Sequence, residues 1–198
     1  MDIQLIPLEA AQTRVPPAQD LGFCIHFANR MFTQRYDRGK GWHDAKIEPY
    51  APIPLSPATS VFHYAQLIFE GLKAYRRPDG HINLFRPMEN MRRFNNSARR
   101  MAMAPVDEEE HLEAICRLIE IEHEWVPRLP DATLYIRPTL IATDDTLGVH
   151  ASSTYLHFVI ISPVGPYFSQ GFSPVPVYIT DEYVRAVHGG VGEAKTGG

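Results

Sequence analysis

The sequence predicts an α+β fold, in which a small α/β domain with a mostly antiparallel sheet is followed by the beginning of a larger second domain. Two strand-like runs, 69–75 and 82–85, flank a turn at residues 77–80 and predict a hairpin. Two amphipathic segments at helical spacing come next, and β-rich runs at 133–142 and 155–161 follow them. Strands grouped in this way, with helices between the groups, are typical of α+β domains.

The chain before the hairpin is predicted to be mainly extended. Pro16 and Pro17 indicate an irregular arm, and the apolar run from Phe23 to Phe32 predicts a strand. Residues 49–57 contain four prolines. Proline lacks a backbone N–H, so this segment favours an edge strand or an extended loop over a helix.

Two helices are predicted between the hairpin and the later strands. The first begins at Pro87, because proline suits the first helical position. Its apolar stripe comprises Met91, Phe94, Ala98, Met101 and Ala102. The second begins at Asp107, where Glu110 completes a pattern like a capping box, and it ends before Pro127. Its buried face comprises Leu112, Ile115, Cys116 and Ile119.

The composition after the last strand predicts a domain boundary. Residues 1–164 form the small N-terminal domain, and the proline- and glycine-rich residues 165–175 form an interdomain loop. Residues 176–198 begin a large second domain whose remainder lies outside this chain.

Composition and charge restrict the class of protein. The chain has 44% hydrophobic and 21% charged residues, as ordinary globular proteins do, and its net charge of −4 gives no reason to expect nucleic acid as a partner. Its apolar runs are too short to span a bilayer, and its N-terminus has no signal-peptide core. Cys24 and Cys116 form no Cys-x-x-Cys pair, and the nine histidines show no ligand spacing. We therefore expect a cytoplasmic protein with free buried thiols, no metal site and no membrane partner.

One lysine, Lys195, stands among five glycines between Gly189 and Gly198. Glycine allows close approach of a ligand, and a desolvated lysine can lose its proton and attack an aldehyde. Arginine forks match phosphate oxygens, which makes Arg93 and Arg185 candidate phosphate ligands. Alone, however, a glycine-flanked lysine is most often a surface-turn residue, and an isolated arginine most often lies on a solvated face.

Six blocks of sequence make the chemistry more specific. They are 63–75, 84–93, 134–138, 147–149, 162–168 and 185–198. In this order and spacing they resemble the branched-chain amino acid aminotransferases, which are class IV (fold type IV) pyridoxal-phosphate enzymes. Each block is weak alone, but six in register form a specific pattern.

The resemblance implies that the cofactor is pyridoxal 5'-phosphate and that Lys195 carries it. The freed amine of Lys195 would then move a proton between the substrate Cα and the cofactor, which is general acid–base catalysis. The resemblance also implies that Arg93 binds the cofactor phosphate and that Arg185 lies near the cofactor.

The implied substrates are branched-chain L-amino acids (Leu, Ile and Val), with 2-oxoglutarate as the acceptor. Tyr135 and Tyr64 would line the substrate site, and Arg137 would support this wall and help to accommodate the glutamate co-substrate. Phe69 and Phe23 would form aromatic walls, although either residue could instead be an ordinary core residue. Leu147 and Val149 would reach into the pocket of a neighbouring subunit, which implies a homodimer. Glu70, within the strongest block, is assigned only a structural hydrogen-bonding role.

The family pattern also includes parts that this sequence lacks. They are the carboxylate that faces the cofactor ring nitrogen, a tyrosine just after Lys-x-Gly-Gly, and later loops around the phosphate. We therefore expect the isolated 198-residue polypeptide to bind the cofactor poorly and to be inactive.

Three alternatives remain open at this point. Other fold-type-IV enzymes, such as D-amino acid aminotransferase, amine transaminase or aminodeoxychorismate lyase, would share the lysine and a phosphate arginine. Residues 189–196 also differ by one position from a phosphate-binding P-loop, although Gly197 is a poor continuation of a helix. Finally, the chain could be a non-enzymatic dimerisation module derived from such an enzyme.

Overall fold

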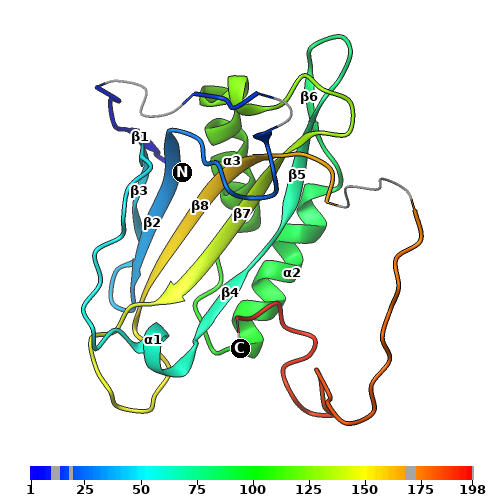
Figure 1. Cartoon of the computed structure of the whole chain (residues 1–198). Coiled ribbons are helices and arrows are strands. Elements are labelled where there is room, and N and C mark those ends of the chain that lie inside the picture. The colour runs from blue at the N-terminus through cyan, green and yellow to red at the C-terminus, as the bar shows by residue number, and fades with distance from the viewer. Residues whose placement is uncertain (10–13, 18–19, 168–172, 198) are drawn as a thin grey trace.

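An eight-stranded sheet forms the centre of the protein (Figure 1). The computed structural model describes residues 1–9, 14–17, 20–167 and 173–197. Strand order is β1-β3-β2-β8-β7-β5-β6, and β4 also pairs with β7. All of these pairs are antiparallel except β1–β3, so the mostly antiparallel prediction is confirmed. The strands are β1 (Gln4–Leu5), β2 (Arg30–Asp37), β3 (Gly41–Pro49), β4 (Leu67–Phe69), β5 (Leu72–Arg76), β6 (Ile82–Leu84), β7 (Thr133–Ala142) and β8 (Thr154–Val164).

Two long helices cover one face of this sheet (Figure 1). They are α2 (Pro87–Arg100) and α3 (Glu108–Ile121), while α1 (Ser60–Tyr64) is a single short turn and His123–Trp125 form a 3-10 turn. Strand side chains alternate between faces. In β7, therefore, Leu134 and Ile136 are buried in the core with the helices, while Tyr135 and Arg137 point to the opposite face. This second face carries most of the candidate site.

The two helices begin where the sequence predicts. Pro87 occupies the first turn of α2, and the Asp107 carboxylate accepts hydrogen bonds from the backbone of Glu109 and Glu110 at the start of α3. The buried face of α3 differs in part from the prediction. Leu112 and Cys116 are only half-buried, because the helix turns His111, Ala114 and Leu118 towards the sheet instead. Similarly, Met101 and Ala102 lie beyond the end of α2.

The strand predicted over Phe23–Phe32 is wrong in its bounds. The chain turns at Gly22 and Cys24, both of which have positive φ, and the strand begins only at Arg30. The sequence prediction also missed β3. The hairpin of β5 and β6 is confirmed, but residues 70 and 71 separate it from β4. Residues 50–56 contain no helix or strand, which confirms the extended loop.

The predicted interdomain loop, 165–175, lies partly outside the described residues. Residues 173–187 are exposed and contain no helix or strand. The domain boundaries therefore stay predictions. Both cysteines are free thiols, half-buried rather than buried. Within the described part of the chain, no helix is both long and apolar enough to cross a bilayer.

Candidate active site

Four of the predicted site residues meet on the open face of the sheet. Arg137 donates a hydrogen bond from Nη2 to the Tyr135 hydroxyl over 2.8 Å, because residues two apart in β7 share a face. The Arg137 guanidinium lies 4.5 Å from the centre of the Phe69 ring. The Lys195 Nζ lies 4.6 Å from the centre of the same ring. An aromatic ring attracts cations in this geometry, so Phe69 interacts with both positive groups.

Backbone pairing brings Lys195 to this face. The Phe69 N–H donates to the Lys195 carbonyl over 3.0 Å, and the Lys195 N–H donates to the Ser97 hydroxyl on α2 over 2.9 Å. Thr196 and Ile68 form an antiparallel β-bridge. A side chain at Gly197 would come within 2.8 Å of Leu67. Glycine at this position therefore allows the C-terminal segment to lie directly against β4.

Arg93 lies on α2 and contacts Glu70, the residue that follows β4. Its Nε and Nη2 donate to the two carboxylate oxygens of Glu70, over 2.5 and 2.9 Å. Glu70 is fully buried, whereas the Arg93 side chain is 53% exposed. The hydrogen bond from Arg93 to Glu70 raises the pKa of Arg93. The exposed side of Arg93 borders a hollow of about 700 Å³ between α2 and Glu193 of the C-terminal segment.

Phe23 and Tyr167 extend the aromatic wall beside Tyr135. The ring centres of Phe23 and Tyr135 are 5.8 Å apart, and those of Phe23 and Tyr167 are 4.8 Å apart with their planes nearly perpendicular. Phe23 is 37% exposed, so it is not an ordinary core residue. The sequence prediction did not select Tyr167, although this tyrosine belongs to the block at 162–168.

Tyr64, Leu147 and Val149 form a separate group at the opposite end of β7. The Tyr64 hydroxyl donates to the Leu147 carbonyl over 2.5 Å, and Leu147 and Val149 are 60% and 87% exposed. Asp144 anchors the loop between β7 and β8 that carries Leu147 and Val149. Burial opposes ionisation of Asp144, but hydrogen bonds from the 152–154 segment outweigh it and lower the pKa of this carboxyl. Within the described ranges, no hydrogen bond, ion pair or ring interaction joins this group to Phe69 or Lys195.

Arg185 is exposed, and among the residues described it makes no hydrogen bond or ion pair. The structure does not bring it together with Lys195, so its role stays a prediction. The predicted strand-like start of the second domain, 177–187, is likewise exposed there.

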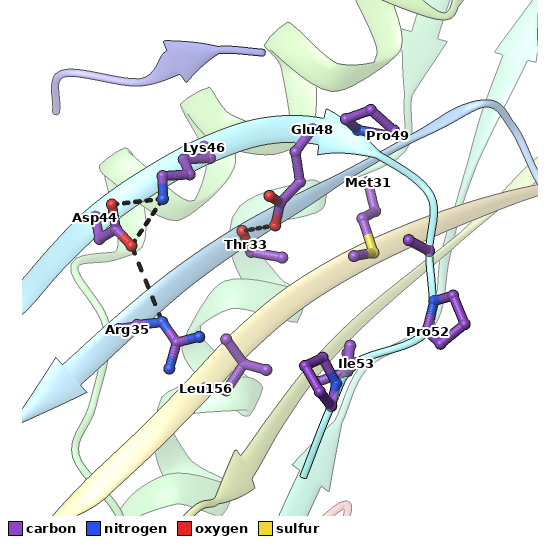
Figure 2. Close-up of a pocket in the computed structure, with 12 residues that line it drawn as sticks. Met31, Thr33, Arg35, Asp44, Lys46, Glu48, Pro49, Pro52, Ile53 and Leu156 are labelled. Atoms are coloured by element: carbon purple, nitrogen blue, oxygen red, sulfur yellow. Dashed lines mark hydrogen bonds and ion pairs between the residues drawn. The ribbon is translucent and has the colours of Figure 1, made fainter. Parts of the chain in front are cut away.

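A second hollow, of about 220 Å³, lies between the sheet and the proline-rich segment at 49–54 (Figure 2). None of the predicted site residues lines it. Its charged groups satisfy one another, because Asp44 pairs with Lys46 and Arg35, and Thr33 donates to Glu48 (Figure 2). The described residues contain no cluster of three or more side chains suited to a metal ion.

Gly71 leaves the space that the Tyr135 hydroxyl occupies. A β-carbon at this position would overlap that hydroxyl. We expect Gly71→Ala to displace the Tyr135 ring, to break its hydrogen bond with Arg137, and to lower the free energy of unfolding by about 1–3 kcal/mol, because overpacking shifts side chains. Unfolding in denaturant would measure this change. Gly39→Ala is the matched control, since Gly39 has open space around it, and an unchanged free energy of unfolding in both variants would contradict the prediction.

Known proteins are similar in sequence to this chain over almost its whole length. The chain is 52% identical over 184 residues to branched-chain-amino-acid transaminase 1 of Bacillus subtilis (strain 168), covering 92% of this chain and 52% of that protein. It is 48% identical over 198 residues to a probable branched-chain-amino-acid aminotransferase of Staphylococcus aureus (strain N315), covering 98% of this chain and 55% of that protein. The chain belongs to the branched-chain-amino-acid aminotransferase family. It spans about half the length of the curated relatives that it matches.

Solved structures of branched-chain aminotransferases share the fold. The enzyme from Thermoproteus uzoniensis, crystallised with norvaline, matches with a TM-score of 0.55 over 71% of this chain and 43% of that one, at 18% identity. A T.th. branched-chain amino acid aminotransferase, complexed with N-(5'-phosphopyridoxyl)-L-glutamate, matches with a TM-score of 0.52 over 66% of this chain and 40% of that one, at 25% identity. No protein-family model matches the chain. The prediction of fold type IV is confirmed, and the P-loop alternative is wrong because Thr196 enters a β-bridge rather than a helix.

Proposed function

We propose that the whole protein transaminates branched-chain L-amino acids, transferring the amino group to 2-oxoglutarate with pyridoxal 5'-phosphate as cofactor. The observation that carries this proposal is the meeting of Lys195, Phe69, Tyr135 and Arg137 on one sheet face. Binding an amino-acid substrate and an aldehyde cofactor requires an amine, an aromatic wall, a hydroxyl and a guanidinium.

The described side chains fit this cofactor at both of its ends. Lys195 is half-buried and its Nζ makes no ion pair in the described part of the chain, so this amine can form the covalent bond to an aldehyde. Arg93 keeps Nη1 without a partner among the described residues and borders a hollow large enough for a phosphate group. When bound, pyridoxal 5'-phosphate supplies an electron sink for the charge that develops at the substrate Cα.

The chain's own residues orient the substrate and move its proton. The Lys195 Nζ would remove the proton from the substrate Cα as a general base and would then, as a general acid, deliver it to the aldehyde carbon of the cofactor. The Tyr135 hydroxyl, held by Arg137, can donate a hydrogen bond to the substrate carboxylate. The Arg137 Nε has no partner among the described residues, so Arg137 can also attract the second carboxylate of glutamate. Phe69 and Phe23 exclude water and contact the aliphatic side chain.

The proposal has four further parts. We infer that Arg185 lies near the cofactor in the whole protein and that residues 176–198 begin its large cofactor-binding domain. The apolar side chains exposed at 177–179 favour a covering domain. The exposed Leu147 and Val149, next to Tyr64, favour a homodimer in which they complete the partner's substrate pocket. The cytoplasm is the proposed location.

Two measurements on the complete protein test this function. An amino-donor panel should show turnover of leucine, isoleucine and valine with 2-oxoglutarate, and little with D-alanine or an aromatic amine. Borohydride reduction followed by peptide mapping should place a pyridoxyl group on Lys195. Preference for D-alanine or an amine would instead identify another fold-type-IV enzyme, while loss of both signals would favour a non-enzymatic module.

A further inference from the structure

The carboxylate of Glu70 is the most completely enclosed charge near the candidate site. It is fully buried, between Phe69 and Gly71, at the point where the chain leaves β4 for β5. Besides the two bonds from Arg93, its Oε2 accepts from the Gly71 backbone over 3.0 Å and from the Asn90 side chain over 2.9 Å. A buried carboxylate is tolerated only when it is paired and hydrogen-bonded in this way. Glu70 is therefore held in one orientation by three different groups.

The same contacts fix the orientation of the Arg93 guanidinium. A guanidinium presents five N–H groups in a rigid plane, arranged along two edges that can each bind an oxyanion. Glu70 occupies the edge formed by Nε and Nη2. Within the described residues Nη1 makes no hydrogen bond, so the edge formed by Nη1 and Nη2 keeps donors available.

Burial shows which way this remaining edge faces. Glu70 lies wholly inside the protein, whereas the Arg93 side chain is 53% exposed. Arg93, Asn90 and Glu193 all line the hollow of about 700 Å³ beside α2. The Glu70 carboxylate therefore lies on the side of the Arg93 guanidinium that faces away from the hollow.

We propose that Glu70 is a positioning residue that orients Arg93, so that the free edge of its guanidinium is presented to the cofactor phosphate. This inference deepens the proposed function and rests on it. Arginine side chains lose considerable rotamer freedom on binding, and a partner that fixes the guanidinium beforehand reduces that loss. Glu70 adds negative charge near a phosphate, so its contribution must come from orientation rather than from attraction.

Glu70→Gln in the complete protein separates orientation from charge. Glutamine keeps the size of the side chain, but one of its two terminal atoms becomes an NH2 donor. Whichever way the amide turns, this donor faces the N–H groups of Arg93, Gly71 or Asn90, since donors meet both oxygens of Glu70. The guanidinium should then lose its fixed orientation.

The measurement compares two ligands of the cofactor-free protein. Pyridoxal 5'-phosphate and pyridoxal differ only in the phosphate, and absorbance titration gives a Kd for each. We expect Glu70→Gln to weaken pyridoxal 5'-phosphate binding about tenfold, as loss of hydrogen bonds to a charged group predicts, and to change pyridoxal binding less than about twofold. The variant Arg93→Ala should show the same selective loss, and adding Glu70→Gln to it should cause no further loss.

Glu89→Gln is the matched control for charge. Glu89 lines the same hollow and pairs with Arg92, and within the described part of the chain no hydrogen bond or ion pair joins it to Arg93. Its removal should leave phosphate binding unchanged or slightly tighter, because a negative charge is lost. If Glu70→Gln does not fold, Glu70→Asp keeps the charge but withdraws the carboxylate by one methylene, and should show the same selective loss.

The outcomes separate this inference from the proposed function. Equal weakening of both ligands in the Glu70 variants would mean that Glu70 only supports the fold, and would overturn the positioning role. Unchanged or tighter binding of pyridoxal 5'-phosphate would also overturn it. If the unmutated protein does not prefer pyridoxal 5'-phosphate over pyridoxal, the proposed cofactor itself is wrong.

Discussion

Replacing Lys195 by alanine in the complete protein is expected to lower kcat for the proposed leucine transamination at least about a thousandfold, because in the proposed function this side chain would supply both the covalent attachment and the proton transfer. The variant should leave the local structure intact. The C-terminal segment is held at this position by the backbone N–H and carbonyl of Lys195, and by Thr196, rather than by the lysine amine. Stopped-flow and steady-state assays would measure the loss of activity.

Lys195→Arg is a second variant, which separates the positive charge of Lys195 from its reactivity as an amine. It keeps a positive charge that can lie over the Phe69 ring, but a guanidinium stays protonated and does not act as a nucleophile. We therefore expect it to be as inactive as Lys195→Ala. Activity within about tenfold of the unmutated protein in either variant would show that the amine is not the reacting group, since general acid–base catalysis alone contributes a factor of about a hundred or more.

The elements that the sequence predicts well are those with a strong local signal. Pro87 and Asp107 mark the first turns of α2 and α3, and the run at 133–142 coincides with β7. The early strands were harder to predict, because their limits depend on a turn of positive φ at Gly22 and Cys24, and an apolar run alone does not reveal it. Of the apolar residues before Arg30, Phe23 reaches the site, Phe27 stacks on Tyr50 and Ala28 packs in the core.

The candidate site likewise has features that sequence motifs predict and features that only the fold shows. Family motifs selected Lys195, Phe69, Tyr135 and Arg137, and the structure brings these four together. No local pattern reveals that the backbone of Lys195 pairs with β4, because the two segments are more than a hundred residues apart in sequence. Motif reasoning also treated Glu70 as a generic structural residue. Only the fold shows that its carboxylate meets Arg93, 23 positions further along the chain.

Another outcome that only the fold reveals is a buried pair of histidines. His111 of α3 and His157 of β8 lie with ring centres 4.5 Å apart, packed against Phe94 and Phe32. None of their four nitrogens has a hydrogen-bond partner within the described part of the chain. Burial lowers the pKa of His111 to about 3, and burial together with the neighbouring His111 lowers the pKa of His157 well below its ordinary value.

These two groups are expected to make the domain sensitive to mild acid. Well above pH 6.5 both rings are neutral in the folded and the unfolded chain, so they add no pH dependence there. Below that value the unfolded chain takes up two protons that the folded core resists, and stability falls as pH falls. The predicted loss between pH 7.5 and 5.5 is about 1.4 kcal/mol per histidine, or about 2.7 kcal/mol for the pair.

Unfolding of the complete protein at pH 7.5 and pH 5.5, followed through tryptophan fluorescence, would measure this loss. Trp42 is a suitable reporter because its ring centre lies 6.3 Å from that of His157. The double variant His111→Met and His157→Met fills similar volume without an ionisable nitrogen, and should be nearly insensitive to this pH step while folding at least as stably at pH 7.5. A pH dependence as steep as that of the unmutated protein would assign the acid sensitivity to other groups, since the double variant retains the remaining histidines. The expected difference arises because no acceptor among the described residues hydrogen-bonds to either ring and could stabilise its protonated form.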